Sequence, residues 1–274
     1  MAQMKSAVVM LPVCLCVGVV CVMYLQSKEV INAITSKVLN STPISTPIQP
    51  VPYAAFDLDK VLSFLPYGSR DCIKLTETLE TSFAWPERYE EAAKAHKMAL
   101  DKAKGGSLEG HSGQIFEQQM VYVKLAQLPF VKTICETGFN AGHSTLIWLA
   151  AKNGTKVYSF DLGSHKYAKK MAQHLQSMYP GRLIVTWGDS TKTLPQFHGA
   201  HPEVKCDLII VDGGHSVPIA TDDFVNFRRM ASSSNIVVFD DYPTKRGLGQ
   251  RLASVWESQL RSGTLAEQYA CTYG

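Results

Sequence analysis

The 274-residue sequence contains no dense block of lysine or arginine, and its formal net charge is only +3. Proteins that bind nucleic acid gather basic residues on one surface, so the sequence gives no indication of a nucleic-acid partner. No internal repeat is visible, which argues against a solenoid or propeller. Hydrophobic residues make up 46% of the chain, enough to form the core of one large domain or two small ones.

None of the seven cysteines forms a C-x-x-C pair, the spacing typical of metal sites and redox motifs. Cys14, Cys16 and Cys21 lie in an apolar run near the N-terminus, and the other four are scattered along the chain. We therefore expect buried free thiols, with a disulfide involving Cys72 or Cys271 as the alternative.

The apolar run at residues 7–25 has nineteen residues and no charge. Roughly 20 apolar residues in a helix cross the hydrocarbon core of a bilayer. The run predicts an uncleaved signal anchor over residues 1–27. The alternative is a cleaved signal peptide with Lys5 as its basic region, but no small-residue cleavage site follows the run before Lys28.

Residues 28–55 are expected to form a stem, because prolines recur at 43, 47, 50 and 52 and favour an extended spacer. N-x-T sequons occur at Asn40 and Asn153. Basic residues flank the apolar run on both sides, so their distribution barely indicates which end of the run faces the cytosol. We expect a single-pass membrane protein of the ER or Golgi, held through its N-terminal helix with the bulk of the chain in the lumen.

Residues 56–112 show a mostly helical pattern that includes the alanine-, glutamate- and lysine-rich stretch after Pro86. A glycine-rich segment at 105–113 follows it. This segment is either a mobile lid over a site or an ordinary linker. A further helix is expected over 113–127.

From residue 131 onward, short runs rich in valine, isoleucine and aromatics alternate with segments that suit helices. Such alternation predicts an α/β fold, a doubly wound and mostly parallel Rossmann-like sheet within a domain spanning 113–274. One more strand is expected near the C-terminus, after residue 264. Each of the five runs closes on an acidic residue, at a strand end that faces the ligand crevice of such sheets: Glu136, Asp161, Asp189, Asp212 and Asp240.

The stretch ICETGFNAGHST, at residues 134–145, joins the first of these strands to a helix. Its spacing differs from the dinucleotide fingerprint G-x-G-x-x-G. Gly138 and Gly142 allow close backbone approach or a positive φ, and Ser144 is expected to act as a helix cap or as a donor at the N-terminus of the helix. The stretch therefore predicts a tight ligand-binding turn beside the carboxylate of Glu136.

Taken together, ETGFNAGHS, FDLG, GDS, VDGGHS and FDDY resemble the class I S-adenosylmethionine-dependent methyltransferases. The nearest branch is the metal-dependent small-molecule O-methyltransferases of the catechol and macrocin type. The resemblance spans about residues 113–242. It implies S-adenosylmethionine as cofactor and O-methylation of a hydroxylated small molecule or a glycan. The alternatives are a metal-free N- or S-methyltransferase and a membrane-tethered, non-catalytic module that binds the cofactor.

The resemblance assigns a cofactor role to residues of each motif. The first motif would meet the methionine end, Asp161 the ribose hydroxyls, and Asp189 with Ser190 the adenine. A carboxylate that accepts two O–H bonds suits a cis-diol. The cofactor-binding set is Glu136, Gly138, Gly142, Ser144, Asp161, Asp189, Ser190 and Asp212.

Asp212, Asp240 and Asp241 are expected to converge at neighbouring strand ends. Three clustered carboxylates would require a counter-charge, and a hard divalent cation supplies one. The resemblance implies Mg²⁺ at these positions and His215 as the base that takes the hydroxyl proton. For His215 the alternative is a hydrogen-bonded loop residue with no chemical role. For Asp240 and Asp241 the alternative is that one of them caps the next segment or pairs with Lys245 or Arg246. The sequence gives no indication of the oligomeric state.

Overall fold

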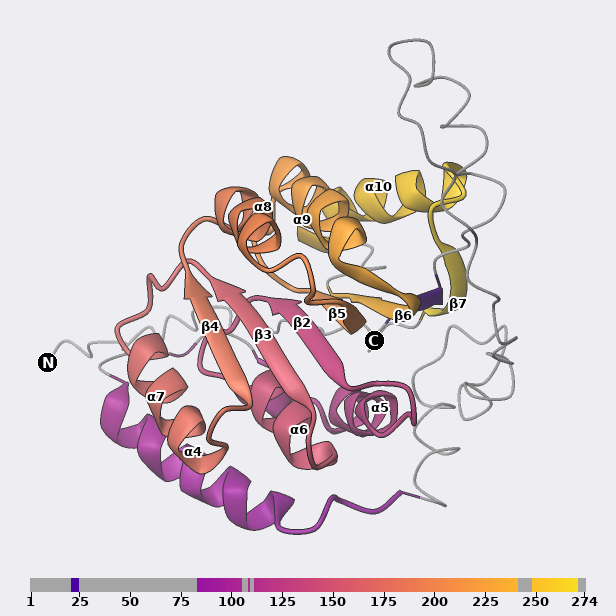
Figure 1. The fold of residues 1–274 in the computed structure, drawn as a ribbon. Coiled ribbons are helices and arrows are strands. Elements are labelled where there is room, and N and C mark those ends of the chain that lie inside the picture. Colours follow the sequence, from indigo (N-terminus) through magenta and orange to yellow (C-terminus); the bar gives the residue numbers. More distant parts are fainter. Residues whose placement is uncertain (1–20, 25–82, 105–107, 109–110, 241–247, 271–274) are drawn as a thin grey trace, which may run out of the picture.

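A computed structural model of the chain describes residues 21–24, 83–104, 108, 111–240 and 248–270. Within these residues, seven strands form one sheet in the order β4-β3-β2-β5-β6-β1-β7 (Figure 1). The strands are β1 (Cys21–Tyr24), β2 (Thr133–Thr137), β3 (Lys156–Asp161), β4 (Leu183–Trp187), β5 (Cys206–Val211), β6 (Ala231–Phe239) and β7 (Ala266–Ala270).

Strands β2 to β6 are parallel, which confirms the predicted doubly wound sheet. β2 lies at the centre, with β3 on one side and β5 on the other. The direction of winding reverses between β2 and β5, and ligands of open α/β sheets bind outside the carboxyl ends of the strands at such a point. The fold therefore places the binding crevice where β2 and β5 end.

Helices cover both faces of the sheet (Figure 1). Side chains alternate across a strand, so β2 sends Ile134 into one core and Cys135 into the other. One face carries α4 (Tyr89–Ala103), α5 (Phe116–Ala126), α6 (His143–Ala151), α7 (Ala168–Met178) and the short 3₁₀ helix η1 (Ser112–Gln114). The other face carries α8 (Ser190–Ala200), α9 (Val217–Met230) and α10 (Leu248–Arg261).

The N-terminal apolar run differs from the expected membrane helix over the four residues that the structure describes. Cys21–Tyr24 forms β1, antiparallel to both β6 and β7. An apolar run suits a buried strand as well as a helix, and the main-chain groups of β6 supply the pairing.

The strand expected after residue 264 is confirmed as β7. No helix in the described part of the chain is both long and apolar enough to cross a bilayer. The other residues of the predicted anchor, and the stem at 28–55, lie outside the described ranges.

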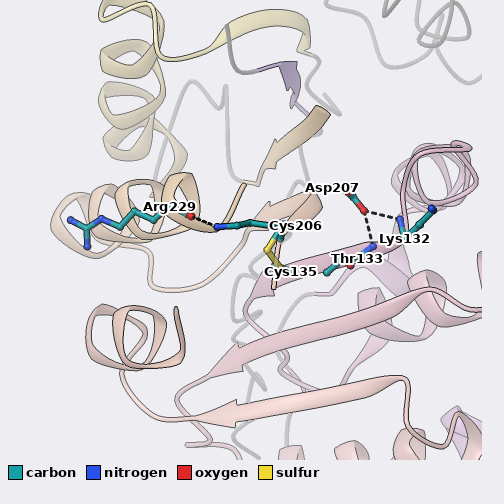
Figure 2. Close-up of a disulfide and its surroundings, with 7 residues drawn as sticks. Lys132, Thr133, Cys135, Cys206, Asp207 and Arg229 are labelled. Atoms are coloured by element: carbon teal, nitrogen blue, oxygen red, sulfur yellow. Dashed lines mark hydrogen bonds between the residues drawn. A yellow bond between two sulfur atoms is a disulfide. The ribbon is translucent and has the colours of Figure 1, made fainter. Parts of the chain in front are cut away.

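A disulfide joins Cys135 of β2 to Cys206 of β5, with the two Cα atoms 5.7 Å apart (Figure 2). The expectation that these two cysteines are free thiols is wrong. They are 71 residues apart in sequence, and only the pairing of β2 with β5 brings them together. Close to this bond, Asp207 accepts hydrogen bonds from the backbone N–H groups of Lys132 (2.9 Å) and Thr133 (3.0 Å).

Candidate active site

The loop after β2 turns through backbone conformations that favour glycine. Gly138 has φ +92° and Gly142 has φ +81°. A Cβ at Gly138 would overlap the carbonyl oxygen of Asp212, and one at Gly142 would lie 2.7 Å from the Phe139 ring. The N–H of Gly138 donates to the carbonyl oxygen of Phe160 at 2.9 Å. The predicted tight turn is confirmed, and it packs directly against the segment that follows β5.

Asp161, at the end of β3, is held by two backbone donors. Its Oδ2 accepts from the N–H of Asn140 at 2.8 Å, and its Oδ1 accepts from the N–H of Gly163 at 2.6 Å. Asn140 is fixed in turn by the hydroxyl of Tyr167, which donates to its side-chain oxygen at 2.7 Å. An ionised carboxylate has about four acceptor sites. Two therefore remain for a ligand in an already oriented group.

Asp189 caps the N-terminus of α8. Its side chain accepts from the backbone N–H of Thr191 at 3.1 Å and from the hydroxyl of Thr191 at 2.7 Å. Lys192 lies 3.1 Å from the same carboxylate. The hydrogen bonds from Thr191 and Lys192 hold the pKa of Asp189 below its usual value, so the group is anionic near neutral pH.

A cavity of about 650 Å³ opens at the carboxyl ends of β2, β3, β4 and β5, and we call it the strand-end pocket. Its volume is typical of a small-molecule site. Both polar groups and apolar surface line it, including the side chain of Leu162, which is 67% exposed. Six residues of the predicted site lie on its wall: Gly138, Asp161, Asp189, Ser190, Asp212 and His215.

Residues 135–242, which include every residue of the strand-end pocket wall, match the family model described as a methyltransferase domain. The match covers less than half of the chain, and we call the matched segment the methyltransferase domain. No curated protein matches the chain by sequence. The motifs quoted above resemble those of class I, whose members use S-adenosylmethionine, and the parallel sheet is compatible with that resemblance.

Solved structures share the fold of the methyltransferase domain at low sequence identity. The methyltransferase PaMTH1 of Podospora anserina, solved with S-adenosylhomocysteine, is 16% identical with a TM-score of 0.50, over 72% of this chain and 89% of that one. The O-methyltransferase TomG of Streptomyces achromogenes, solved with S-adenosylmethionine, is 18% identical with a TM-score of 0.48, over 70% and 85%. At 16% identity the comparison with PaMTH1 supports the fold alone.

Three predicted cofactor residues of the methyltransferase domain, Glu136, Gly142 and Ser144, do not line the strand-end pocket. Glu136 is buried and accepts hydrogen bonds from Ser144 (2.8 Å), Thr145 and Trp148 (2.9 Å) of α6. Burial raises the pKa of Glu136, and these donors oppose the rise. Gly142, not Ser144, occupies the N-cap position of α6, and the hydroxyl of Ser144 is a donor at the start of the helix, to Glu136. In this structure, Glu136 and Ser144 fasten α6 to β2 beneath the glycine turn.

A second, smaller pocket of the methyltransferase domain contains Asp212, His215 and Asp240, and we call it the rim pocket. Asp212 and His215 also line the strand-end pocket, so the two pockets share a wall. Asp241 lies outside the described residues. No three His, Cys, Asp or Glu side chains within the described ranges are arranged to hold a metal ion. The structure therefore brings two of the three predicted metal ligands to one pocket and leaves the third undescribed.

Two residues of α5 that were not predicted from sequence are linked to Asp240, a residue of the rim pocket wall. Gln118 is 3% exposed, and its side-chain amide donates to Asp240 at 3.0 Å and to the Tyr122 hydroxyl at 3.1 Å. Burial raises the pKa of Tyr122 well above its usual value, and the charges of Asp240 and Asp212 add to the rise. The available signal in the sequence was a set of polar residues on a helix that precedes the motifs. Their partner could not be predicted, because Asp240 lies 122 residues after Gln118.

Proposed function

We propose that the strand-end pocket binds S-adenosylmethionine. The observation that carries the proposal is the position of Asp161, which two backbone N–H groups orient on the same wall as Gly138 and Asp212. Its two remaining acceptor sites suit the hydroxyls of a ribose. The exposed side chain of Leu162 next to it offers apolar contact to a flat base, and Asp189 with Ser190 supplies polar partners for that base.

The reaction we propose is methyl transfer to a hydroxyl oxygen of a small molecule or a glycan. Bound S-adenosylmethionine would supply the methyl group: its carbon–sulfur bond would break as the carbon–oxygen bond to the acceptor forms, which would leave the neutral thioether of S-adenosylhomocysteine. His215 takes the hydroxyl proton. Its side chain is exposed and lines both pockets, so it is open to an acceptor that approaches from solvent.

The rim pocket is the proposed place for Mg²⁺, with Asp212 and Asp240 as ligands and Asp241 as the third. Their carboxylates fit the preference of this ion, which is commonly held by one or two carboxylates together with water and substrate oxygens. A bound Mg²⁺ would lower the pKa of the acceptor hydroxyl. Gln118 orients Asp240 from the side of α5.

The disulfide supports the proposed placement of the domain in the secretory lumen. Disulfides persist in oxidising compartments and are rare in the cytosol. Cys135 and Cys206 are fully buried, so their bond is part of the core. The sequon residue Asn153 is exposed in the turn after α6, where a glycan could be attached. A lumenal domain is consistent with both observations, whereas the pairing of Cys21–Tyr24 within the sheet leaves these four residues out of the proposed signal anchor.

Methyl transfer from isotope-labelled S-adenosylmethionine to a panel of catechols, sugars and glycans tests this function. We expect label in an ether product, with activity that EDTA abolishes and added Mg²⁺ restores. Activity indifferent to EDTA and to Asp240→Ala would remove the metal from the mechanism. Label found only on amine or thiol acceptors would replace O-methylation with the metal-free alternative.

A further inference from the structure

Asp223 of α9 is a buried carboxylate to which the proposed mechanism assigns no role. Its side chain is 0% exposed, and neither oxygen has a hydrogen-bond partner of good geometry among the described residues. Its neighbour Asp222 is exposed on the same helix. Burying a carboxylate without full hydrogen bonding is costly, so an unpaired group at this depth calls for an explanation.

The carboxylate of Asp223 lies directly behind the wall of the strand-end pocket. A Cβ added to Gly213 would be 3.1 Å from Asp223 Oδ2, 2.9 Å from the Thr137 Cβ and 3.0 Å from the Thr137 hydroxyl. Thr137 and Asp223 therefore both face the side of Gly213 that a Cβ would occupy, and they leave no room for a side chain there. Thr137, Gly213 and Ser190 all line the pocket. The hydroxyl of Thr137 is itself buried without a partner within the described structure.

The charged groups that act on Asp223 are acidic. Burial raises its pKa to about 6, the nearby hydroxyls of Ser190 and Thr137 oppose the rise, and Asp222 and Asp189 add to it. A cation on the pocket side of the wall would relieve this repulsion and favour the ionised form. Within the proposed function, the ligand brings such a charge, because S-adenosylmethionine carries a sulfonium in addition to its ammonium group.

We propose that Asp223 is a positioning and specificity-determining residue of the strand-end pocket, which favours the cationic methyl donor over the product. It acts through the wall formed by Thr137, Gly213 and Ser190. S-adenosylhomocysteine keeps the ammonium group but has a neutral sulfur. The proposed preference therefore depends on the sulfonium charge, which only the methyl donor carries. This inference rests on the proposed function, because it assumes that the pocket holds this pair of ligands.

The test compares the affinities of S-adenosylmethionine and S-adenosylhomocysteine by calorimetry on the full chain, at several pH values between 5 and 8. Asp223→Asn removes the charge and keeps the shape, and Asp222→Asn is the matched control on the same helix. We expect Asp223→Asn to weaken donor binding about tenfold, as expected of a charge roughly 10 Å away at intermediate dielectric, and product binding much less. The donor-to-product affinity ratio of the wild type should fall as the pH drops through about 6, where Asp223 gains a proton.

In Asp223→Asn that fall in the ratio should be absent, whereas Asp222→Asn should keep it. This difference separates the effect of Asp223 on the affinity ratio from any effect of His165 and His215. These two histidines line the pocket and remain in both variants. Equal losses for the two ligands, or no loss, in a variant with wild-type melting temperature would overturn the proposal. If Asp223→Asn does not fold, Asp223→Ser takes its place, with the same expectations. A wild type that binds neither ligand would instead refute the proposed function.

Discussion

The side-chain amide of Gln118 donates a 3.0 Å hydrogen bond to Asp240, joining α5 to the end of β6 across 122 residues of sequence. The same amide reaches the hydroxyl of Tyr122 one turn further along α5. A helix that precedes the strand motifs therefore takes part in the rim pocket. Its role there is to fix the direction of a carboxylate that is proposed to bind the metal.

Replacing Gln118 with leucine keeps the volume and removes the donor. A hydrogen bond to a charged group contributes about 1.5–3 kcal/mol, so we expect kcat to fall roughly 10- to 100-fold. The Mg²⁺ concentration for half-maximal activity should rise, while the Kd for S-adenosylmethionine should stay unchanged. Gln119→Leu is the control, because the side chain of Gln119 accepts a hydrogen bond from Tyr89, whereas that of Gln118 donates to Asp240. Equal effects of the two substitutions on metal dependence would contradict the role of Gln118.

Gly138→Ala should severely destabilise the methyltransferase domain. The new methyl group would overlap the carbonyl oxygen of Asp212, and the positive φ adds strain of about 1 kcal/mol. Gly154→Ala is the control, because Gly154 also has a positive φ (+83°) but has no atom within 4 Å of an added Cβ. Urea unfolding should show a loss of several kcal/mol for Gly138→Ala and about 1 kcal/mol for Gly154→Ala. Similar losses in both would show that the close approach to Asp212 is absent.

The disulfide between Cys135 and Cys206 should contribute measurably to stability. The chain-entropy model predicts about 4 kcal/mol for a closed loop of this length, and the double variant Cys135→Ala/Cys206→Ala should lose a comparable amount. Thiol labelling of the unfolded protein, with and without reductant, checks the bond itself. Two additional labelled cysteines should appear after reduction, and mass spectrometry should place them at these positions. Full labelling at both positions without reductant would rule the bond out.

Stability should decrease as the pH falls below about 6.5. Burial is the largest cause that lowers the pKa of His96 to about 4 and that of His143 to about 3, and each histidine also acts on a neighbouring one. The His143 ring stacks on His111 at 3.5 Å between centroids. Because the unfolded chain binds protons at higher pH than the folded chain does, the stability present above pH 6.5 is lost progressively toward pH 4.

The pH dependence can be assigned to this cluster with one substitution. His96 alone, with a pKa near 4 in place of 6.5, corresponds to about 3 kcal/mol across that range. His96→Phe should flatten the decline in chemical unfolding measured between pH 7 and pH 5. His201→Phe, at a half-exposed histidine of the α8 C-terminus, is the control and should leave the slope unchanged. The same slope in wild type and His96→Phe would show that the cluster is not the cause.

The parallel sheet and the positions of its acidic strand ends could be predicted from sequence, because short runs of β-branched and aromatic residues and the carboxylates that end them are local signals. Asp161 and Asp189 were found for this reason. The direction of the Glu136 side chain could not be predicted from sequence. Its hydrogen-bond donors lie on the following helix, and only the packing of α6 turns the side chain away from the pocket. The disulfide of Cys135 depends on which strands are neighbours in the sheet, and the hydrogen bond of Gln118 to Asp240 depends on where α5 packs. Neither of these long-range contacts leaves a local pattern in the sequence.

The central claim is that the strand-end pocket holds S-adenosylmethionine through Asp161, and calorimetry on the full chain tests it most directly. Wild-type protein should bind with micromolar affinity, and Asp161→Ala should lose at least tenfold because the ribose hydroxyls lose their acceptor. Asp207→Ala is the control, since Asp207 also accepts two backbone N–H bonds but at the opposite end of the strands. Binding that is equally strong in wild type and Asp161→Ala, or no binding by folded wild type, would contradict the account.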